Sequence, residues 1–308
     1  MIDLFAGCGG MTQGFVDAGF EPILAVEFNP HAAATYAANF GIDHTICGDI
    51  ADVNEYSVPE VDLVIGGPPC QGFSNLGSKD INDPRNKLWR EYVRIVNHAH
   101  PKVFVIENVD RFLKSSEFSL LIKEVKPGGR LEGYELTYGT LNSADYGVPQ
   151  KRIRTIVIGS LIGRIELPPP THSQSSESCQ DRRRPWVALR NRIWGLPATP
   201  STTNLPDRSQ SIFGRIIPGP FTSEELHIGR NPRSKSIARY ALVPPGGGRF
   251  DIAAKAPELL PRCWAEKPTG TTDVMGRLEW EKPSVTIRTE FFKPEKGRYL
   301  HPQWVEGD

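Results

Sequence analysis

The stretch Ile2-Asp-Leu-Phe-Ala-Gly-Cys-Gly-Gly10 decides the fold class. A short apolar run, Ile2–Phe5, stops at glycines, and Met11–Ala18 then has helical spacing. Glycines at such a turn let the backbone approach a ligand closely, beside the N-terminus of the helix that follows. We therefore expect a nucleotide-type site at the carboxyl end of the first strand.

Strand-like and helix-like segments alternate over the first two-thirds of the chain. This alternation is typical of an α/β fold in which helices cover both faces of a parallel sheet. The expected helices are Met11–Ala18, His31–Phe40 and Trp89–His98, and the expected strands are Ile2–Phe5, Ile23–Glu27, Val61–Ile65, Val103–Glu107, Glu135–Leu141 and Thr155–Ile158.

The alternation ends at Leu167-Pro-Pro-Pro-Thr171, a stiff stop that is followed by polar residues. Many prolines and glycines come after it, including Pro244-Pro-Gly-Gly-Gly248, and periodicity is weak. We place a domain boundary near residue 170. The second part should be small and loop-rich, and loops are where recognition tends to lie.

Composition excludes several classes of protein. The 308 residues are 39% hydrophobic and 23% charged, which rules out disorder along the whole chain. No run of 18 apolar residues is long enough to span a membrane, and no secretion signal is visible. The five cysteines are odd in number and widely spaced, so we expect no disulfide framework and a cytosolic location. No Cys/His spacing resembles a zinc site, and we expect no metal.

Charge is balanced overall but uneven along the chain. Lys plus Arg and Asp plus Glu number 36 each, yet residues 181–240 carry 11 Lys/Arg against 4 Asp/Glu. A basic segment in a neutral chain can hold a polyanion locally. Its candidates for DNA contacts are Arg182, Arg183, Arg184, Arg230, Arg233 and Lys235.

Residues 1–110 are acidic, with 6 Lys/Arg against 15 Asp/Glu. Five of those six cations lie in one stretch. A run of charge alone favours a solvated helix face, and the alternative is a loop that contacts phosphates. The five cations are Lys79, Arg85, Lys87, Arg90 and Arg94.

Two acids near strand ends describe an adenosine pocket. Glu27 closes the second strand, where a carboxylate can accept both hydroxyls of a ribose, and Asp49 follows the next short segment, where it can hold an adenine amino group. The loop Gly7-x-Gly9-Gly10 is not the dinucleotide pattern G-x-G-x-x-G. It therefore favours S-adenosylmethionine over a nicotinamide dinucleotide. A glycine turn with an incidental acid is the structural alternative.

Cys70 has the context of a reactive cysteine, whereas most isolated cysteines are small core residues. It lies in Val64-Ile-Gly-Gly-Pro-Pro-Cys-Gln-Gly-Phe-Ser74, where a buried strand ends in glycines and two prolines stiffen the backbone. This places Cys70 at the same sheet edge as the adenosine pocket. The other four cysteines lack such context, and we interpret them as structural.

A cysteine beside a methyl sulfonium suggests one chemistry. Carbon 5 of cytosine is a poor nucleophile, but a thiolate that adds to C6 produces an enamine that can attack a methyl group. The addition needs a proton or a strong hydrogen bond at N3, and Glu107 ends the next apolar strand at the correct edge. A surface carboxylate at a strand end is the alternative interpretation of Glu107.

Two arginines precede the last expected strand, in Gln150-Lys-Arg-Ile-Arg154. Strand alternation predicts that Arg152 and Arg154 share a face. One can hold the base O2, and the other a phosphate or Glu107. An edge-strand charge pair is the alternative.

Together these residues resemble the DNA (cytosine-5)-methyltransferases. The resemblance covers residues 1–171 strongly and resumes from Ala238 to Gln303, with 175–235 as the variable part. The motifs occur in order: Phe5-Ala-Gly-Cys-Gly-Gly10, Glu27, Gly48-Asp-Ile50, Gly66-Gly-Pro-Pro-Cys-Gln-Gly-Phe-Ser74, Asp83-Pro-Arg85 with Leu88, Glu107-Asn-Val109, and Gln150-x-Arg152-x-Arg154.

The resemblance implies a Rossmann-like S-adenosylmethionine-dependent methyltransferase domain with a small, loop-rich target recognition domain. It implies Cys70 as nucleophile, Glu107 as the N3 partner and Arg154, with Arg152, at the base. The mobile loop Gln71–Asn86 would close over double-stranded DNA, with Gln71, Ser74 and Arg85 in contact, and the target base must be extruded to reach Cys70. The implied cofactor contacts are Phe5, Gly7, Gly9, Glu27, Phe28, Asp49, Ile50, Pro69 and Leu88.

One departure from the family concerns the C-terminus. The family normally continues past a position like His301-Pro-Gln303 with an Arg-Glu-bearing helix and an Ile-Gly-Asn segment, and neither is present. We divide the chain into a catalytic domain (1–171), a recognition domain (172–285) and a return segment (286–308). A second chain with the missing motifs would reconcile the sequence with activity, and we expect 1–308 alone to bind cofactor weakly and methylate poorly.

Three functions remain open at this point. The first is a DNA cytosine-C5 methyltransferase of a prokaryotic restriction–modification system, which acts in the cytosol and releases S-adenosylhomocysteine. The second is an RNA methyltransferase with the same chemistry, and the long insertion at 172–285 argues for DNA instead. The third is an inactive or complementing subunit of a split enzyme, against which the intact Cys70, Glu107 and Arg154 argue.

Overall fold

The chain folds into two units that interleave along the sequence. The computed structural model describes residues 1–69, 88–174, 183–197, 199–267, 269 and 272–303. The chain passes from one unit to the other at Pro168–Pro169, near the boundary that the sequence suggests, and also at two earlier and two later points. The first unit comprises Met1–Leu141, Ile153–Pro168 and Asp207–Pro220, and the second comprises Asn142–Arg152, Pro169–Pro206 and Phe221–Asp308.

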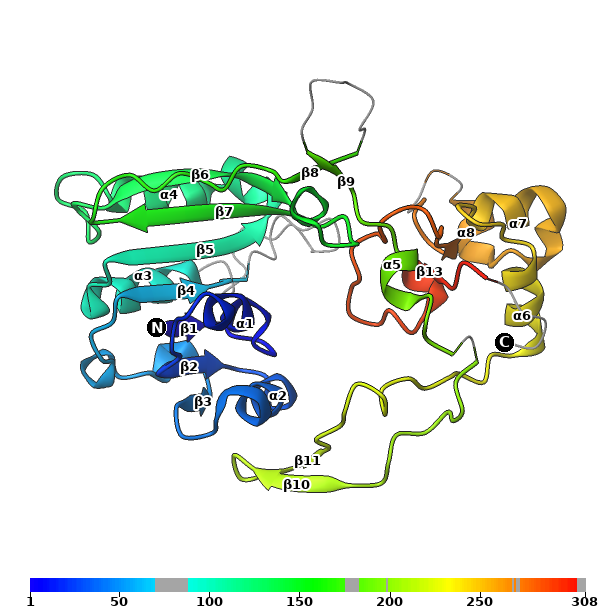
Figure 1. Cartoon of the computed structure of the whole chain (residues 1–308), viewed down its shortest axis with the longest axis horizontal. Helices are drawn as coiled ribbons and strands as arrows, with labels where there is room; N and C mark the ends of the chain where they lie inside the picture. The colour runs from blue at the N-terminus through cyan, green and yellow to red at the C-terminus, as the bar shows by residue number, and fades with distance from the viewer. Residues whose placement is uncertain (70–87, 175–182, 198, 268, 270–271, 304–308) are drawn as a thin grey trace. The chain divides into compact units, whose positions relative to one another are not determined.

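A seven-stranded sheet in the order β3-β2-β1-β4-β5-β7-β6 forms the centre of the first unit (Figure 1). β1 to β5 pair in parallel, whereas β7 pairs antiparallel with β5. The strands are β1 (Ile2–Leu4), β2 (Leu24–Glu27), β3 (Thr45–Cys47), β4 (Leu63–Gly66), β5 (Val103–Val109), β6 (Glu135–Asn142) and β7 (Ile153–Ser160).

The expectation of a wholly parallel sheet is therefore wrong at β7. Only residues 143–152 connect β6 to its neighbour β7, and their one helical element is the short turn η6 (Ser143–Tyr146). A connection of this length has no room for the crossover helix that parallel neighbours need, so β7 returns in the opposite direction.

Capping residues set the ends of helices in the first unit. Asn29 caps α2, because its side-chain oxygen accepts hydrogen bonds from the backbone N–H groups of His31 and Ala32. Gly41, with φ of 116°, ends the same helix. The helices are α1 (Gly10–Asp17), α2 (Pro30–Phe40), α3 (Leu88–Ala99) and α4 (Ser116–Glu124), with the 3₁₀ turns η1 (Ile50–Asp52), η2 (Glu55–Ser57) and η5 (Asp110–Lys114).

The two faces of this sheet are covered unequally. The larger core packs α3 and α4 against one face, where Tyr92 and Phe104 are fully buried. Smaller clusters lie under α1 and α2 on the other face, around Ile65 and Tyr36. Burial of each large side chain contributes roughly 2 kcal/mol, so the first face supplies more of the stability.

A hairpin from the variable region belongs to the first unit. Its strands are β10 (Ser209–Ile212) and β11 (Arg215–Pro218). Ile212 and Ile217 are buried against Ala34 and Ala37 of α2. This packing holds residues 207–220 on the sheet-bearing unit, although the neighbouring residues on both sides belong to the second unit.

The second unit contains short elements around a small core. Tyr240, Ile252 and Met275 are buried there. Arg277 is also buried, and its guanidinium donates to the backbone carbonyls of Val243, Tyr240 and His301 at 2.6–2.7 Å. The elements of the second unit are β8 (His172–Ser173), β9 (Arg184–Pro185), α5 (Arg190–Ile193), α6 (Ser234–Ala241), α7 (Arg249–Lys255), η7 (Pro257–Leu259), α8 (Arg262–Glu266), β12 (Gly276–Arg277), η8 (Pro294–Lys296) and β13 (Arg298–Leu300).

Candidate active site

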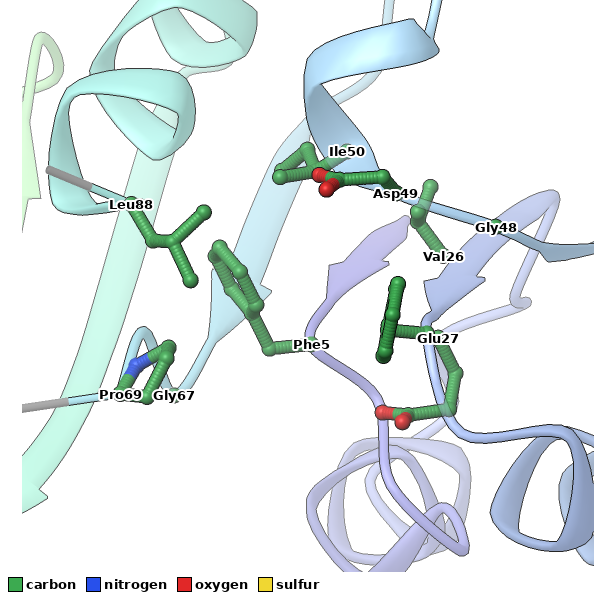
Figure 2. A pocket seen from close by; sticks show the side chains of 10 residues that line it. Phe5, Val26, Glu27, Gly48, Asp49, Ile50, Gly67, Pro69 and Leu88 are labelled. Atoms are coloured by element: carbon green, nitrogen blue, oxygen red, sulfur yellow. The ribbon is translucent and has the colours of Figure 1, made fainter. Parts of the chain in front are cut away.

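A cavity of about 540 Å³ opens at the carboxyl ends of β1, β2 and β4. Figure 2 shows the Phe5 ring facing Leu88 and Pro69 on one side, with the carboxylates of Glu27 and Asp49 on the other. Seven of the nine cofactor residues expected from the sequence line it. The lining residues are Phe5, Val26, Glu27, Phe28, Gly48, Asp49, Ile50, Gly67, Pro69 and Leu88.

The glycine loop shapes one wall of this cavity without lining all of it. Phe5 and Gly7 have φ of 62° and 58°, so the chain turns sharply after β1. Gly9 is the N-cap of α1 with φ of 86°, and a Cβ there would lie 2.2 Å from the Phe40 ring. Gly9 is thus required for close packing of the loop on α2, a different role from the cofactor contact that the sequence suggested.

Glu27 is held by two backbone N–H groups. Gly7 N–H donates to its Oε2 at 2.8 Å, and Asn29 N–H donates to its Oε1 at 2.7 Å. The carboxylate is therefore fixed before any ligand binds, with lone pairs left for further donors. Two convergent oxygens at a cavity wall suit the two hydroxyls of a ribose.

Asp49 and Ile50 reach the cavity from a turn that Arg94 supports. Asp49 caps η1 by accepting from Ala51 N–H at 2.9 Å. Arg94 donates to the carbonyls of Ile50, at 2.9 Å, and Val53, at 3.1 Å. Burial opposes the charge of Arg94, but the hydrogen bonds that it donates to Glu91 and Glu55 outweigh this effect and raise its pKa.

Arg94 therefore has neither of the roles proposed for the cation stretch. It is neither a solvated helix-face residue nor a phosphate contact, because its guanidinium is bound to the turn below the cavity and to Glu91 and Glu55. Sequence spacing alone gives no signal for contacts to residues about forty positions away. Lys79, Arg85 and Lys87 lie outside the described residues.

The strand end that leads to Cys70 is anchored by Asn108. The side-chain amide of this buried residue donates to the Pro68 carbonyl at 2.9 Å. The backbone is thereby fixed two residues before Cys70, which itself lies outside the described residues, as do Gln71 and Ser74. Asn108 was quoted within a sequence motif but was given no role there.

Glu107 and Arg154 form an ion pair at the same edge. Arg154 Nε lies 2.8 Å from Glu107 Oε1, and about a quarter of each side chain is exposed. The two residues come from neighbouring strands, β5 and β7, whose register pairs Glu107 with Ile156. A Cβ on Gly67 would lie 3.5 Å from Glu107 Oε2, an ordinary contact distance, so the backbone before the prolines runs beside this carboxylate. Of the three partners suggested for these arginines, the base O2, a phosphate and Glu107, the structure places Glu107 beside Arg154.

The remaining expected residues lie in the second unit. Arg152 immediately precedes β7, and its backbone bonds to Asn142 and Ser143. Arg230 donates to the Phe292 carbonyl, and Arg233 and Lys235 are exposed at the start of α6. The part of the chain that the structure describes holds no group of three or more His, Cys, Asp or Glu suited to a metal ion.

A buried acid below the glycine loop was missed from the sequence. Asp3 is 1% exposed, and it accepts a hydrogen bond from Thr12, whose hydroxyl lies 3.2 Å from that of Tyr36. Burial raises the pKa of Asp3 to about 7, the bond from Thr12 opposes this shift, and the nearby charge of Glu27 adds to it. An acid inside a three-residue apolar strand was the available signal.

Comparison with known proteins identifies the family. The family described as C-5 cytosine-specific DNA methylase matches residues 1–211. The chain belongs to this family. The resemblance inferred from the sequence motifs is thereby confirmed, and the family favours the DNA methyltransferase interpretation over the RNA alternative.

Several type II methyltransferases are similar to this chain. M.AquIA of Picosynechococcus is 36% identical over 70% of this chain and 96% of its own length. M1.HphI of Haemophilus parahaemolyticus is 41% identical over 56% of this chain, but over only 49% of itself. The match thus spans about half of M1.HphI and nearly all of M.AquIA.

A solved structure agrees on the fold. A protein described as a DNA modification methyltransferase of an E. coli prophage superposes with a TM-score of 0.56 over 99% of this chain and 84% of its own, at 22% identity. The expected Rossmann-like α/β fold of this C5 DNA methylase is confirmed. None of the helices in the described ranges is long and apolar enough to cross a membrane.

Proposed function

We propose that this chain, alone or with a partner, transfers a methyl group from S-adenosylmethionine to carbon 5 of a cytosine in double-stranded DNA, as part of a restriction–modification system. The observation that carries this proposal is the meeting of three features at one sheet edge. These are a preformed cavity beyond β1, the anchored Pro68–Pro69 backbone that follows β4 and leads to Cys70, and the Glu107–Arg154 pair, in which Glu107 lies near the carboxyl end of β5.

The cavity fits S-adenosylmethionine in size and chemistry. Its volume of about 540 Å³ lies within the range of small-molecule sites. Glu27 would accept the ribose hydroxyls, and Asp49 would accept the adenine amino group. The apolar side chains Phe5, Ile50 and Leu88 would contact the adenosyl rings. When bound, S-adenosylmethionine supplies an electrophilic methyl group.

The residues at the strand ends would activate the cytosine. The Cys70 thiolate would add to C6, which forms a C–S bond and moves electron density toward C5 and N3. Glu107 would donate a proton or hydrogen bond at N3, while Arg154 holds its Oε1 in place. After methyl transfer, loss of the C5 proton and of the thiolate would restore the aromatic base. An extruded base is required, because Cys70 cannot reach C6 inside a duplex.

We also propose that the second unit reads the DNA target, with the recognition domain (172–285) joined to the catalytic domain by the return segment 286–308. The support is a bridge within that unit. Lys151 N–H donates to the Ser284 carbonyl at 2.8 Å, and the Thr286 hydroxyl donates to the Lys151 carbonyl at 2.7 Å. The end of the recognition segment is thus tied to the Gln150–Arg152 motif.

Covalent trapping tests the function. The chain is incubated with S-adenosylmethionine and a mixed-sequence duplex that contains 5-fluorocytosine, because fluorine at C5 blocks the final elimination. We expect a denaturation-resistant protein–DNA band that Cys70→Ala abolishes and Cys263→Ala leaves intact. A band with RNA and none with DNA would contradict the substrate proposed here, and no band with either, even after the partner described next is added, would contradict the chemistry.

We further propose that a second chain with the C-terminal motifs completes the enzyme. The support is an incompletely covered sheet face. On β5, Phe104 and Ile106 are buried under α3, whereas Val103 and Val105 on the opposite face are only partly buried. Ile158, the partner of Val105 across β7, is partly buried too. Interior strands of such sheets are normally covered on both faces, and a helix of the second chain would fit this apolar strip.

Substitution on that face tests the partner. Addition of a second chain that carries the Arg-Glu helix and the Ile-Gly-Asn segment should raise the trapping yield. Ile158→Lys should abolish that increase, whereas the matched change Ile153→Lys, at an exposed position of β7, should not. Full activity of 1–308 without the second chain, or an equal response of both variants, would contradict the proposal.

A further inference from the structure

A second cavity, of about 500 Å³, lies in the second unit and is distinct from the cofactor pocket. It is lined by Pro170, Thr171, His172, Arg183 and Arg184. Two arginines, a histidine and a threonine therefore border one hollow, and none of its lining residues in the described part of the chain is acidic. This donor set suits an anion with several oxygens, such as a phosphate.

The backbone around this cavity is held by a continuous set of hydrogen bonds. β8 pairs with β9 in parallel, and Arg184 N–H donates to the Thr171 carbonyl at 3.0 Å. Thr171 N–H in turn donates to the Asp145 carbonyl at 2.9 Å. The two arginines are thus attached to a fixed ladder, and this reduces the entropy lost when they bind a ligand.

A glycine and a tryptophan fix the floor of the site. Gly147 has φ of 85°, and a Cβ there would lie 2.8 Å from the His172 ring, so the imidazole packs directly on the turn. The Trp186 indole N–H donates to Asp145 Oδ1 at 2.8 Å. This bond occupies one carboxylate oxygen of Asp145, whose backbone carbonyl accepts from Thr171 N–H.

Cations predominate on the segments that build this ladder. Residues 143–152, 170–174 and 183–186 carry Lys151, Arg152, Arg183 and Arg184 against the single acid Asp145, a net charge of +3. The Lys151 ammonium lies 4.9 Å from the centre of the Trp186 ring, which places it on the same ladder. Cations thus outnumber acids on the described segments that build the ladder.

We propose that this cavity binds a backbone phosphate of the DNA substrate, next to the nucleotide that the Gln150–Arg152 motif holds. The proposal rests on the proposed function in taking DNA as the substrate. Phosphate contacts fix the position of a protein on DNA and carry no sequence information. The site would thus position the target strand for extrusion, and the loops of the recognition domain would read its sequence.

Salt-dependent binding tests this site. The probe is a fluorescein-labelled, 24-base-pair mixed-sequence duplex, and its Kd is measured by anisotropy between 50 and 300 mM KCl. For the double variant Arg183→Gln/Arg184→Gln, we expect the slope of log Kd against log salt to fall by about 1–2 and affinity at 0.1 M salt to fall by about tenfold. The loss should be the same for duplexes of different sequence.

Two controls separate this role from a general effect of charge or folding. Arg262→Gln/Lys267→Gln removes the same charge from exposed positions of α8 and the loop after it and should leave the slope unchanged. Arg183→Lys/Arg184→Lys keeps the charge and should keep most of the slope. An unchanged slope in the first variant, or an equal fall in the α8 control, would overturn the proposal. A fall in slope with no covalent trapping by the wild type, even after the second chain is added, would support the phosphate site and contradict the methyltransfer chemistry.

Discussion

At the scale of single residues, Glu107 couples the catalytic proposal to a specific contact. Its Oε1 is fixed by Arg154 at 2.8 Å, and it does not line the cofactor cavity. Glu107→Gln should therefore lower the rate of methyl transfer by about 10²–10³ while the affinity for S-adenosylmethionine stays unchanged, since amides are poor proton donors. Single-turnover kinetics and cofactor titration measure the two effects.

The matched control for this prediction is Glu60→Gln, which changes an exposed acid of the same unit. It should affect neither the rate nor the cofactor affinity. A Glu107→Gln enzyme with the wild-type rate would show that N3 receives its proton from another group. A loss of cofactor affinity instead would show that the carboxylate acts on the cavity.

The buried Asp3 predicts a pH dependence of stability. Its pKa is about 7 in the folded chain against an ordinary value of 3.8, so the folded state binds the proton more tightly than the unfolded state. Stability from this group is therefore greatest below about pH 4 and falls as the pH rises to about 7. The shift of about three pH units corresponds to at most about 4 kcal/mol.

Asp3→Asn should remove that dependence and still accept the Thr12 hydrogen bond. We expect the variant to melt at a higher temperature than the wild type at pH 8, and the difference to shrink toward pH 5. Thermal melting of both proteins across this range provides the measurement, with the exposed Asp17→Asn as control. Parallel pH profiles for Asp3→Asn and the wild type would contradict the assignment of the shift to this carboxyl.

At the scale of elements, two adjacent glycines before α1 should respond differently to the same change. Gly9 has φ of 86° and lies against Phe40, whereas Gly10 is the first residue of the helix and has open space around its Cβ position. Gly9→Ala should cost at least about 1–2 kcal/mol from its left-handed backbone alone, and the close contact with the ring adds to this. Gly10→Ala should be neutral or stabilising by a few tenths of a kcal/mol.

Chemical denaturation of the two glycine variants gives these differences directly. Cofactor titration adds a second measurement, since the Gly9 turn leads from the wall of the cavity into α1. Equal losses of stability in the two variants would contradict this prediction. They would mean that the turn at Gly9 relaxes to accommodate the alanine side chain.

Elements were predictable where burial imposes a pattern. The bounds of β1, β2, β4 and β5 agree with the expected apolar runs to within two residues. These runs are visible in the sequence because both faces of a parallel strand exclude polar side chains. The glycine loop, Glu27 and Asp49 were predictable because they follow such strands. Strand direction was not, because β7 carries the same apolar signal in either orientation.

Long-range contacts left no local trace in the sequence. Arg94 supports a turn about forty residues away, Asn108 anchors Pro68, and the hairpin 209–218 packs on α2. Each depends on tertiary proximity, which periodicity does not encode. The family resemblance places the hairpin in the variable region, whereas Ile212 and Ile217 pack it on the first unit.

At the scale of the whole molecule, a substitution that destabilises one unit should leave the stability and binding of the other unchanged. Arg277 satisfies three backbone carbonyls in the second unit, and every residue of the cofactor cavity lies in the first. Arg277→Met would leave these carbonyls without their donor, at about 1–3 kcal/mol each. We expect DNA binding to be lost and cofactor binding to persist.

Calorimetry of Arg277→Met, with and without S-adenosylmethionine, distinguishes the outcomes. One of two melting transitions should move to a lower temperature, and the cofactor should stabilise only the other. Arg262→Met, on the surface of α8, is the control and should leave both in place. A single transition that moves as a whole would mean that the units unfold together.

The interleaved chain also bears on how the protein is made. A ribosome releases the α2 residues Ala34 and Ala37 long before Ile212 and Ile217, their packing partners. At about 5–20 residues per second, the nascent α2 waits roughly ten to thirty seconds for that hairpin. During this interval β3 to β7 are released, and one side of an Ala-rich helix stays uncovered. Any gene fragment that stops at Pro168 makes this intermediate permanent, so an expression vector for the cofactor-binding half should carry the hairpin as well.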